Sequence, residues 1–114
     1  MGEDVVHRAL AAFNAGDAAA FADLFAEDAV MIDYPDKLAG TGPAQIQAYL
    51  ASLFAAFPNA RVALQGRIDL GARQITHERF DRGDGSPAYD AALVYTLSGP
   101  EIVRMDFVRA LPGT

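Results

Sequence analysis

The hydrophobic pattern of the chain changes its period near Pro58. Before that proline, apolar residues recur every three to four positions, which is typical of helices that bury one face. From Arg61 onward they alternate with polar residues, which is typical of strands. Because a chain of 114 residues is long enough for one core and too short for two, both kinds of element must share it. The pattern predicts a single α+β domain over residues 1–114.

Turn and cap signals divide this pattern into eight elements. Gly16 can take a left-handed cap after the first helix, Asp17 can cap the second, and Pro43 is a favoured first-turn residue of the third. The stretches RGDG and SGP link the last three strands as hairpins. The predicted helices cover 3–14, 18–26 and 43–57, and the predicted strands cover 29–34, 61–70, 73–81, 87–97 and 101–110.

Hairpin-linked strands cannot lie flat and still cover three helices. A mostly antiparallel sheet must therefore curl strongly around the helices, and a curled sheet leaves an apolar hollow at its centre. We expect any small ligand to bind in that hollow.

Composition excludes several classes of function. The formal net charge of −6 argues against a nucleic-acid partner or an anionic membrane surface. No cysteine is present, and of the two histidines His7 is expected on an exposed helix turn, so we expect no metal site and no other cofactor. The first residues are acidic where a signal peptide would be basic, and no apolar run is long enough for a membrane span; we expect a cytoplasmic protein.

Three stretches resemble a known superfamily in sequence and in the order of their elements. They are FNAGDAAAFADLFAEDAVMID, GTGPAQIQAYL and EIVRMDFVRA. The resemblance is to the NTF2-like cone, which includes nuclear transport factor 2, ketosteroid isomerases and SnoaL-like polyketide cyclases, and it covers nearly the whole chain. The superfamily also contains dehydratases, epoxide hydrolases and non-catalytic binders, so function must be argued from the site.

Asp33 is the first candidate for that site. It alternates with Ala29 and Met31 on one face of the predicted strand 29–34. The resemblance places Asp33 where ketosteroid isomerases carry their general base, and burial in a pocket would raise its pKa toward neutrality. Alternatively, Asp33 lies exposed at the strand end or caps the turn before Pro35.

His77, Arg79 and Asp90 are further candidates. Matching to the superfamily predicts that Ile75, His77 and Arg79 point inward on the strand 73–81. Counting outward from the 82–85 turn brings His77 opposite Asp90, close enough for an imidazole–carboxylate acid–base pair. Arg79 could then stabilise a substrate anion. Alternatively these residues form a structural ion pair on the sheet surface.

The two proton donors that ketosteroid isomerases use are absent. The corresponding positions fall at Ala9 and Ala92, so steroid isomerisation by that mechanism is not expected. Residues that could replace the donors are Tyr49, His77, Arg79 and Tyr95, and alternation alone does not rank them. A weaker resemblance to the epoxide hydrolases rests on Asp33, Arg79 and Asp90, without the spacing of their motif.

We expect a small cofactor-free enzyme that does acid–base chemistry on an apolar, carbonyl-bearing molecule. The predicted pocket walls are Phe13, Phe25, Met31, Tyr49, Phe54 and Phe57. A homodimer is expected through the outer sheet face, where Tyr89, Leu93, Tyr95 and Leu97 would otherwise form an exposed apolar patch. The alternatives are a binding protein that uses the same hollow without chemistry, and a dimerising module whose hollow is filled by its own side chains.

Overall fold

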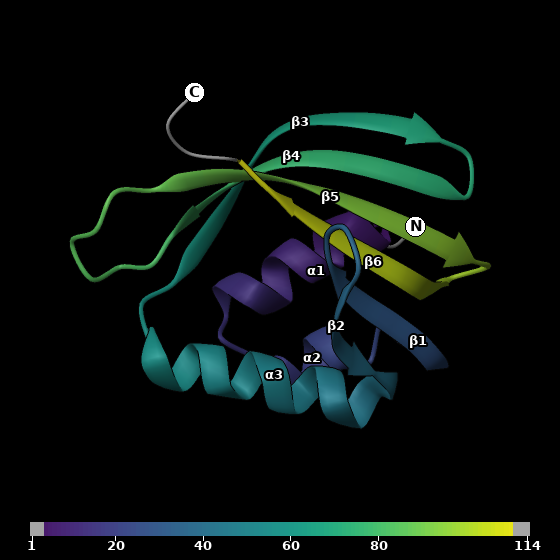
Figure 1. Cartoon of the computed structure of the whole chain (residues 1–114), viewed down its shortest axis with the longest axis horizontal. Helices are drawn as coiled ribbons and strands as arrows, with labels where there is room; N and C mark the ends of the chain where they lie inside the picture. Colours follow the sequence, from purple (N-terminus) through teal and green to yellow (C-terminus); the bar gives the residue numbers. More distant parts are fainter. Residues whose placement is uncertain (1–3, 111–114) are drawn as a thin grey trace.

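A computed structural model describes residues 4–110 as three helices and one curved sheet of six strands (Figure 1). The strand order is β2-β1-β6-β5-β4-β3, and only the β1–β6 pair is parallel among the described strands. The elements are α1 (Val5–Asn14), α2 (Ala18–Ala22), β1 (Phe25–Asp33), β2 (Lys37–Thr41), α3 (Gly42–Ala56), β3 (Arg61–Leu70), β4 (Arg73–Asp81), β5 (Tyr89–Ser98) and β6 (Glu101–Arg109).

The helix ends follow the capping signals of the sequence. Gly16 has a φ of 65°, a left-handed conformation that favours glycine, and it separates α1 from α2. The Asp17 carboxylate accepts a hydrogen bond from the Ala20 backbone N–H at 3.0 Å, which caps α2. Pro43 lies in the first turn of α3, as predicted.

Two elements differ from the prediction. The second helix was predicted to run to about Ala26, but α2 ends at Ala22 because Phe25 and Ala26 already belong to β1, where Phe25 pairs with Ile102 on β6. The strand β2 was not predicted; it forms a hairpin with β1. Since β1 and β2 precede α3, the third helix is not N-terminal to the sheet.

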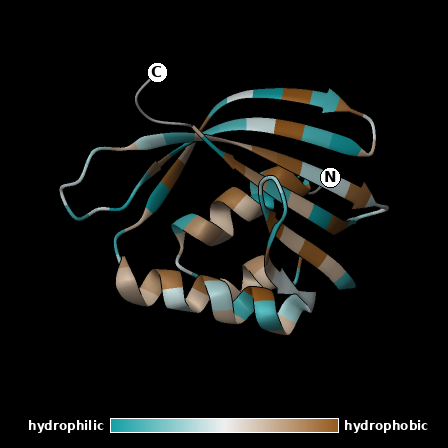
Figure 2. Cartoon of the chain, in the orientation of Figure 1, coloured by the Kyte–Doolittle hydropathy of each residue, from teal (hydrophilic) through white to brown (hydrophobic). Residues whose placement is uncertain are grey.

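The hydrophobic core lies between the helices and the concave face of the sheet. Hydropathy alternates along β3 and β4, and the helices carry long apolar stretches (Figure 2). Val6, Ile46 and Ile102 are fully buried there. The Asn14 side-chain amide donates to the Val62 carbonyl at 2.9 Å and accepts from the Val62 N–H at 2.7 Å, which fixes the end of α1 against β3.

Register shifts interrupt several strand pairs and are typical of a bending sheet. They occur between Leu64 and Gly66 on β3 and between Thr96 and Leu97 on β5. The sheet therefore wraps around α1 and leaves its concave face turned toward the helices (Figure 1). Among the described residues, no helix is long and apolar enough to cross a membrane.

Candidate functional site

A cavity of about 190 Å³ opens between the helices and the concave face of the sheet. Most of its lining is apolar and comes from all three helices and from the strands. The lining includes Ala9, Phe13, Phe21, Leu53, Phe80 and Leu93. A cavity of ~150 Å³ in another protein holds benzene, so this space suits a molecule whose body is about one ring in size.

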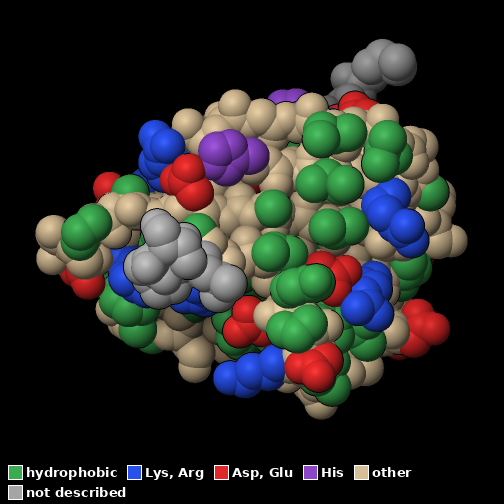
Figure 3. Space-filling view, turned by 45° about the horizontal axis from the view of Figure 1, so that its top comes forward, with side chains coloured by type: hydrophobic (Ala, Val, Ile, Leu, Met, Phe, Trp, Pro, Cys, Tyr) green, Lys and Arg blue, Asp and Glu red, His purple; other side chains and the backbone are tan. Residues whose placement is uncertain are grey.

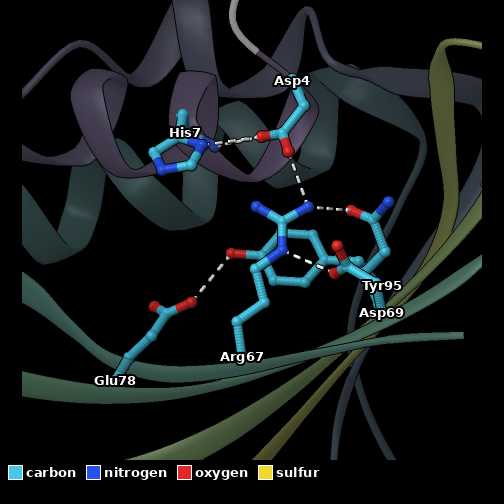
Figure 4. A network of polar contacts seen from close by, with 7 residues as sticks. Asp4, His7, Arg67, Asp69, Glu78 and Tyr95 are labelled. Atoms are coloured by element: carbon cyan, nitrogen blue, oxygen red, sulfur yellow. Dashed lines mark hydrogen bonds and ion pairs between the residues drawn. The ribbon is translucent and has the colours of Figure 1, made fainter.

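Glu78 on β4 lines this cavity with only 2% of its surface exposed. Its Oε2 atom accepts two hydrogen bonds, from the Thr76 hydroxyl at 2.6 Å and from the Tyr95 hydroxyl at 3.0 Å. Figure 4 shows the contact between Glu78 and Tyr95. Sequence reasoning missed this cluster of one carboxyl and two hydroxyl groups.

The second carboxyl oxygen of Glu78, Oε1, has no hydrogen-bond partner among residues 4–110. Across that same range, every side-chain nitrogen or oxygen that is fully enclosed has a hydrogen-bond partner. Because Oε1 has none, it is not fully enclosed, and a molecule of water size can reach it. The open space beside the Glu78 side chain is the cavity, because Glu78 is one of its lining residues. Oε1 is therefore the atom through which Glu78 can contact a ligand.

Burial raises the pKa of the Glu78 carboxyl, against the hydrogen bonds from Thr76 and Tyr95, which lower it. Burial also raises the pKa of the Tyr95 hydroxyl well above its usual value, and the nearby Glu78 raises it further. A raised pKa extends the pH range in which each group keeps its proton. The two side chains are therefore a carboxyl and a phenol with raised pKa on the wall of an apolar cavity.

The inward set of β4 is the opposite of the predicted one. The buried residues are Thr76, Glu78 and Phe80. His77 and Arg79 are exposed on the outer face, so the prediction that they point inward is wrong. Phe80 decides the alternation because its ring packs against Phe13, with ring centroids 5.6 Å apart, and must lie in the core.

The prediction of which β5 side chains face outward is also wrong, because they too pack into the core. Leu93 and Tyr95 were expected on an outer dimer surface, but both are buried and line the cavity. Tyr89 lines the cavity too, and Leu97 packs against the core. The aromatic residues of β4 and β5, which are Phe80, Tyr89 and Tyr95, all line the cavity. Their positions in the sequence could therefore have indicated which face of each strand is the inner one.

His77, Arg79 and Asp90 do meet, but on the outer face of the sheet, which Figure 3 shows from outside. His77 Nε2 lies 2.7 Å from Asp90 Oδ2, and Arg79 Nε donates to Asp90 Oδ1 at 2.8 Å. Asp90 is directly opposite Arg79, whereas His77 is opposite Ala92, so the His77–Asp90 contact is diagonal and the predicted register is wrong.

The environment of these three side chains is that of a surface ion pair. Their side chains are 52%, 51% and 37% exposed, in the order His77, Arg79, Asp90. The Arg79 hydrogen bond, followed by that of His77, lowers the pKa of Asp90 to about 2. None of the three lines the cavity. The Asp33–Arg79–Asp90 set that resembles the epoxide hydrolases is therefore not assembled.

Asp33 lies at the end of β1, partly buried, and lines the cavity. Its charge acts on Tyr49 of α3, whose pKa is raised first by burial and then by Asp33, while Arg109 lowers it. Asp33, Tyr49 and Arg109 all line the cavity, and Tyr49 is 44% exposed. The role of Asp33 as a base stays a prediction.

Four of the six predicted wall residues line the cavity, and two do not. Those that line it are Phe13, Met31, Tyr49 and Phe57. Phe25 instead packs against Phe21, with ring centroids 5.6 Å apart, and Phe54 packs behind Phe13 at 5.2 Å. Both rings support the wall from the core.

The two alanines at the expected donor positions lie on different sides of the sheet. Ala9 lines the cavity and offers no donor there. Ala92 is opposite His77 and Val108 on the outer face, so it is not a cavity position. Of the proposed replacements, Tyr49 and Tyr95 line the cavity. Within residues 4–110, no group of three His, Cys, Asp or Glu side chains could hold a metal ion.

Two arginines border the cavity beside its aromatic residues. The Arg82 guanidinium lies 5.5 Å from the Phe57 ring centroid and 5.0 Å from that of Tyr89. The Arg109 guanidinium lies 5.4 Å from the Tyr89 centroid and 5.3 Å from that of Phe107. Both arginines line the cavity.

Solved structures of similar fold match the chain over nearly its full length. An uncharacterized cystatin-fold protein from Novosphingobium aromaticivorans is 26% identical, with a TM-score of 0.85, over 95% of this chain and 100% of that one. A hypothetical protein of ketosteroid isomerase-like fold from Catenulispora acidiphila, in complex with trimethylamine, is 22% identical, with a TM-score of 0.83, over 97% and 88% of the two chains.

A putative polyketide cyclase from Sinorhizobium meliloti is 20% identical to this chain, with a TM-score of 0.78, and the match covers 93% of this chain and 94% of that one. No curated protein matches the chain. A six-stranded curved sheet that closes on three helices around a cavity defines the NTF2-like class of α+β folds. Residues 6–105 match the SnoaL-like domain, and the chain belongs to the SnoaL-like domain family.

Proposed function

We propose that this chain is a small enzyme that performs general acid–base chemistry on an apolar, carbonyl-bearing molecule in its cavity, without a cofactor. The observation that carries the proposal is the Glu78–Tyr95 pair, a carboxyl and a phenol with raised pKa on an apolar cavity wall. An apolar cavity with a few polar groups is typical of small-molecule sites.

The roles follow from where the groups lie. Asp33, which lines the same cavity, is the general base that removes a proton from carbon next to the carbonyl. Glu78, through its free Oε1, donates a hydrogen bond to the carbonyl oxygen, and Tyr95 holds Glu78 in place through Oε2. Such donors stabilise the negative charge that develops on oxygen in an enolate. His77, Arg79 and Asp90 take no part, because they lie on the outer face.

Deuterium exchange of small ketones tests this proposal without knowledge of the natural substrate. We expect the protein to accelerate exchange of the α-protons of cyclohexanone and 2-cyclohexenone in D₂O, followed by ¹H NMR. Asp33→Asn should reduce that rate by about 100-fold, because it removes the base. Glu78→Gln should reduce it by about tenfold or more.

The matched control is His77→Ala, which should leave the exchange rate unchanged. If the ketones bind and yet no variant or wild-type protein accelerates exchange, the enzymatic proposal fails. One observation favours the remaining candidate, a non-catalytic binding protein: within residues 4–110, no hydrogen bond orients the Asp33 side chain. In that case Asp33→Asn should change ligand affinity by no more than a few fold.

A homodimer through the outer sheet face remains a proposal, with a different surface from the predicted one. Ile68 and Leu70 of β3 are 58% and 59% exposed, and Ile68 is in register with Ile75 and then Val94. These residues form an apolar row beside charged side chains (Figure 3). Sedimentation velocity should show a dimer that Ile68→Glu converts to a monomer; a monomeric wild-type protein would contradict the proposal.

A further inference from the structure

Among the described residues, Arg82 and Arg109 line the cavity without an ion-pair partner, unlike three arginines elsewhere on the sheet. Arg67, Arg79 and Arg104 each form an ion pair with an aspartate. Within residues 4–110, neither Arg82 nor Arg109 has a carboxylate oxygen within 4.0 Å. In a protein with 15 acidic and 9 basic residues, two guanidinium groups without a direct ion pair can attract an anionic group of a ligand.

Aromatic rings hold both guanidinium groups at the cavity. Tyr89 contacts both of them, and Phe57 and Phe107 each contact one. A guanidinium stacked on a ring keeps the N–H groups at its edge available for a carboxylate. Three acidic residues, Asp33, Glu78 and Asp81, line the same cavity, but within residues 4–110 none forms an ion pair with either arginine, and Asp81 accepts a hydrogen bond from the Gly83 N–H at 2.8 Å.

Arg82 and Glu78 lie at separate places along β4 and its extension, and Arg109 reaches the cavity from β6. Glu78, Phe80 and Arg82 follow one another at every second position and all line the cavity. At ~3.3 Å per residue, the Cα atoms of Glu78 and Arg82 are roughly 13 Å apart, with the Phe80 ring between them. Along this line the cavity has a hydrogen-bonding group at Glu78, an apolar middle and the Arg82 guanidinium, which shares the Tyr89 ring with that of Arg109.

We propose that the cavity binds a small amphipathic anion, with a carbonyl or hydroxyl group at Glu78, a body of about one ring beside Phe80, and a carboxylate at Arg82 and Arg109. This inference rests on the proposed function, since it specifies the ligand of the same cavity. The cavity volume of about 190 Å³ limits the enclosed part to roughly one ring, so a four-ring steroid does not fit inside.

A pair of probes that differ only in charge tests the inference. Calorimetric titration at low ionic strength compares 4-acetylbenzoate with its neutral analogue 4-acetylbenzamide. We expect the anion to bind about tenfold more tightly, because a charge-assisted hydrogen bond contributes more than a neutral one. The double variant Arg82→Gln/Arg109→Gln should remove that preference and leave the affinity for 4-acetylbenzamide within about twofold.

Two control variants separate charge from packing. Arg8→Gln/Arg73→Gln removes two exposed positive charges that do not line this cavity, and it should keep the tenfold preference. Arg82→Lys/Arg109→Lys keeps the charge and should restore part of the preference. If both probes lose affinity equally in Arg82→Gln/Arg109→Gln, the arginines only pack the wall and the inference is overturned.

The remaining outcomes distinguish this inference from the proposed function. Equal binding of both probes to the wild-type protein overturns the anionic ligand but leaves a ligand cavity. Binding of neither probe, together with no ketone exchange, overturns both proposals. Intermolecular NOEs should connect the acetyl methyl group with the Tyr95 ring; NOEs with the Phe57 ring instead would overturn the proposed orientation.

Discussion

Glu78 and Asp90 are carboxyl groups on neighbouring strands of one sheet, and they face opposite sides of it. Each accepts hydrogen bonds from two side chains, Glu78 from Thr76 and Tyr95, and Asp90 from Arg79 and His77. Their pKa values nevertheless move in opposite directions. Burial raises the pKa of Glu78, whereas Arg79 lowers that of Asp90 to about 2.

The difference shows that the partners of a carboxyl group do not by themselves indicate a functional site. The outer cluster matches the expected acid–base pair in residue type and distance, but water surrounds it and its aspartate is held ionised. The inner cluster contains no histidine and no arginine, and the low-polarity cavity favours the protonated form. Four predictions test how far the two faces differ.

The largest expected difference is in stability, between two adjacent residues of β5. Tyr95→Ala should lower the free energy of unfolding by about 3–5 kcal/mol, because it opens a cavity and removes a buried hydrogen bond. Val94→Ala, on the outer face, should cost about 1 kcal/mol. Urea unfolding measures both, and equal losses would contradict the assignment of the two faces.

The second difference is in the pH dependence of stability. Because the folded-state pKa of Glu78 is raised, its contribution is fully present below the unfolded value of about 4.5 and is lost as pH rises through the folded value. Wild-type stability should fall in that range by at most about 1.4 kcal/mol per pH unit, relative to Glu78→Gln.

The contribution of Asp90 to stability changes with pH in the opposite direction. Its pKa is lowered, so its contribution is present above the usual value and is lost as pH falls toward about 2. The stability of Asp90→Asn should therefore change with pH in the same way as that of wild type above pH ~4, and in a different way below it. Denaturation curves at a series of pH values separate the two carboxyl groups, and the same pH profile for both variants would refute the comparison.

A third, smaller effect is expected at Asp4, near the inner cluster (Figure 4). The Asp4 carboxylate caps α1 and pairs with Arg67 at 2.6 Å, and Arg67 holds the pKa of Asp4 well below its usual range. Asparagine caps a helix about as well, so Asp4→Asn isolates the ion pair, and it should cost about 0.5–1 kcal/mol at pH 7. The pair forms only while Asp4 is ionised, so that loss should disappear as pH falls below about 3.8.

The smallest effect is expected for His77→Ala on the outer face. An exposed pair contributes little, so the free energy of unfolding should change by less than about 0.5 kcal/mol. The measurement is the same urea titration, with Glu78→Ala as the contrast. A loss above about 2 kcal/mol at His77 would mean that the outer cluster is structurally important after all.

Much of the fold could be predicted from local signals in the sequence. The left-handed Gly16, the cap at Asp17 and the proline at the start of α3 each act within a few residues, so their effect does not depend on the rest of the chain. The short strand β2 could not be predicted in this way, because its residues KLAGT carry little strand preference and β1 supplies their partners.

Which residues share a face along β4 and β5 follows from the order of residues alone, because successive side chains of a strand point to opposite faces. Which of the two sets faces the cavity depends on long-range packing, since a sheet can present either face until the rings of Phe80, Phe13 and Tyr95 are packed in the core. That packing buried Glu78 and left His77 in water. The chemistry of the candidate site therefore depends on a choice that no local pattern makes.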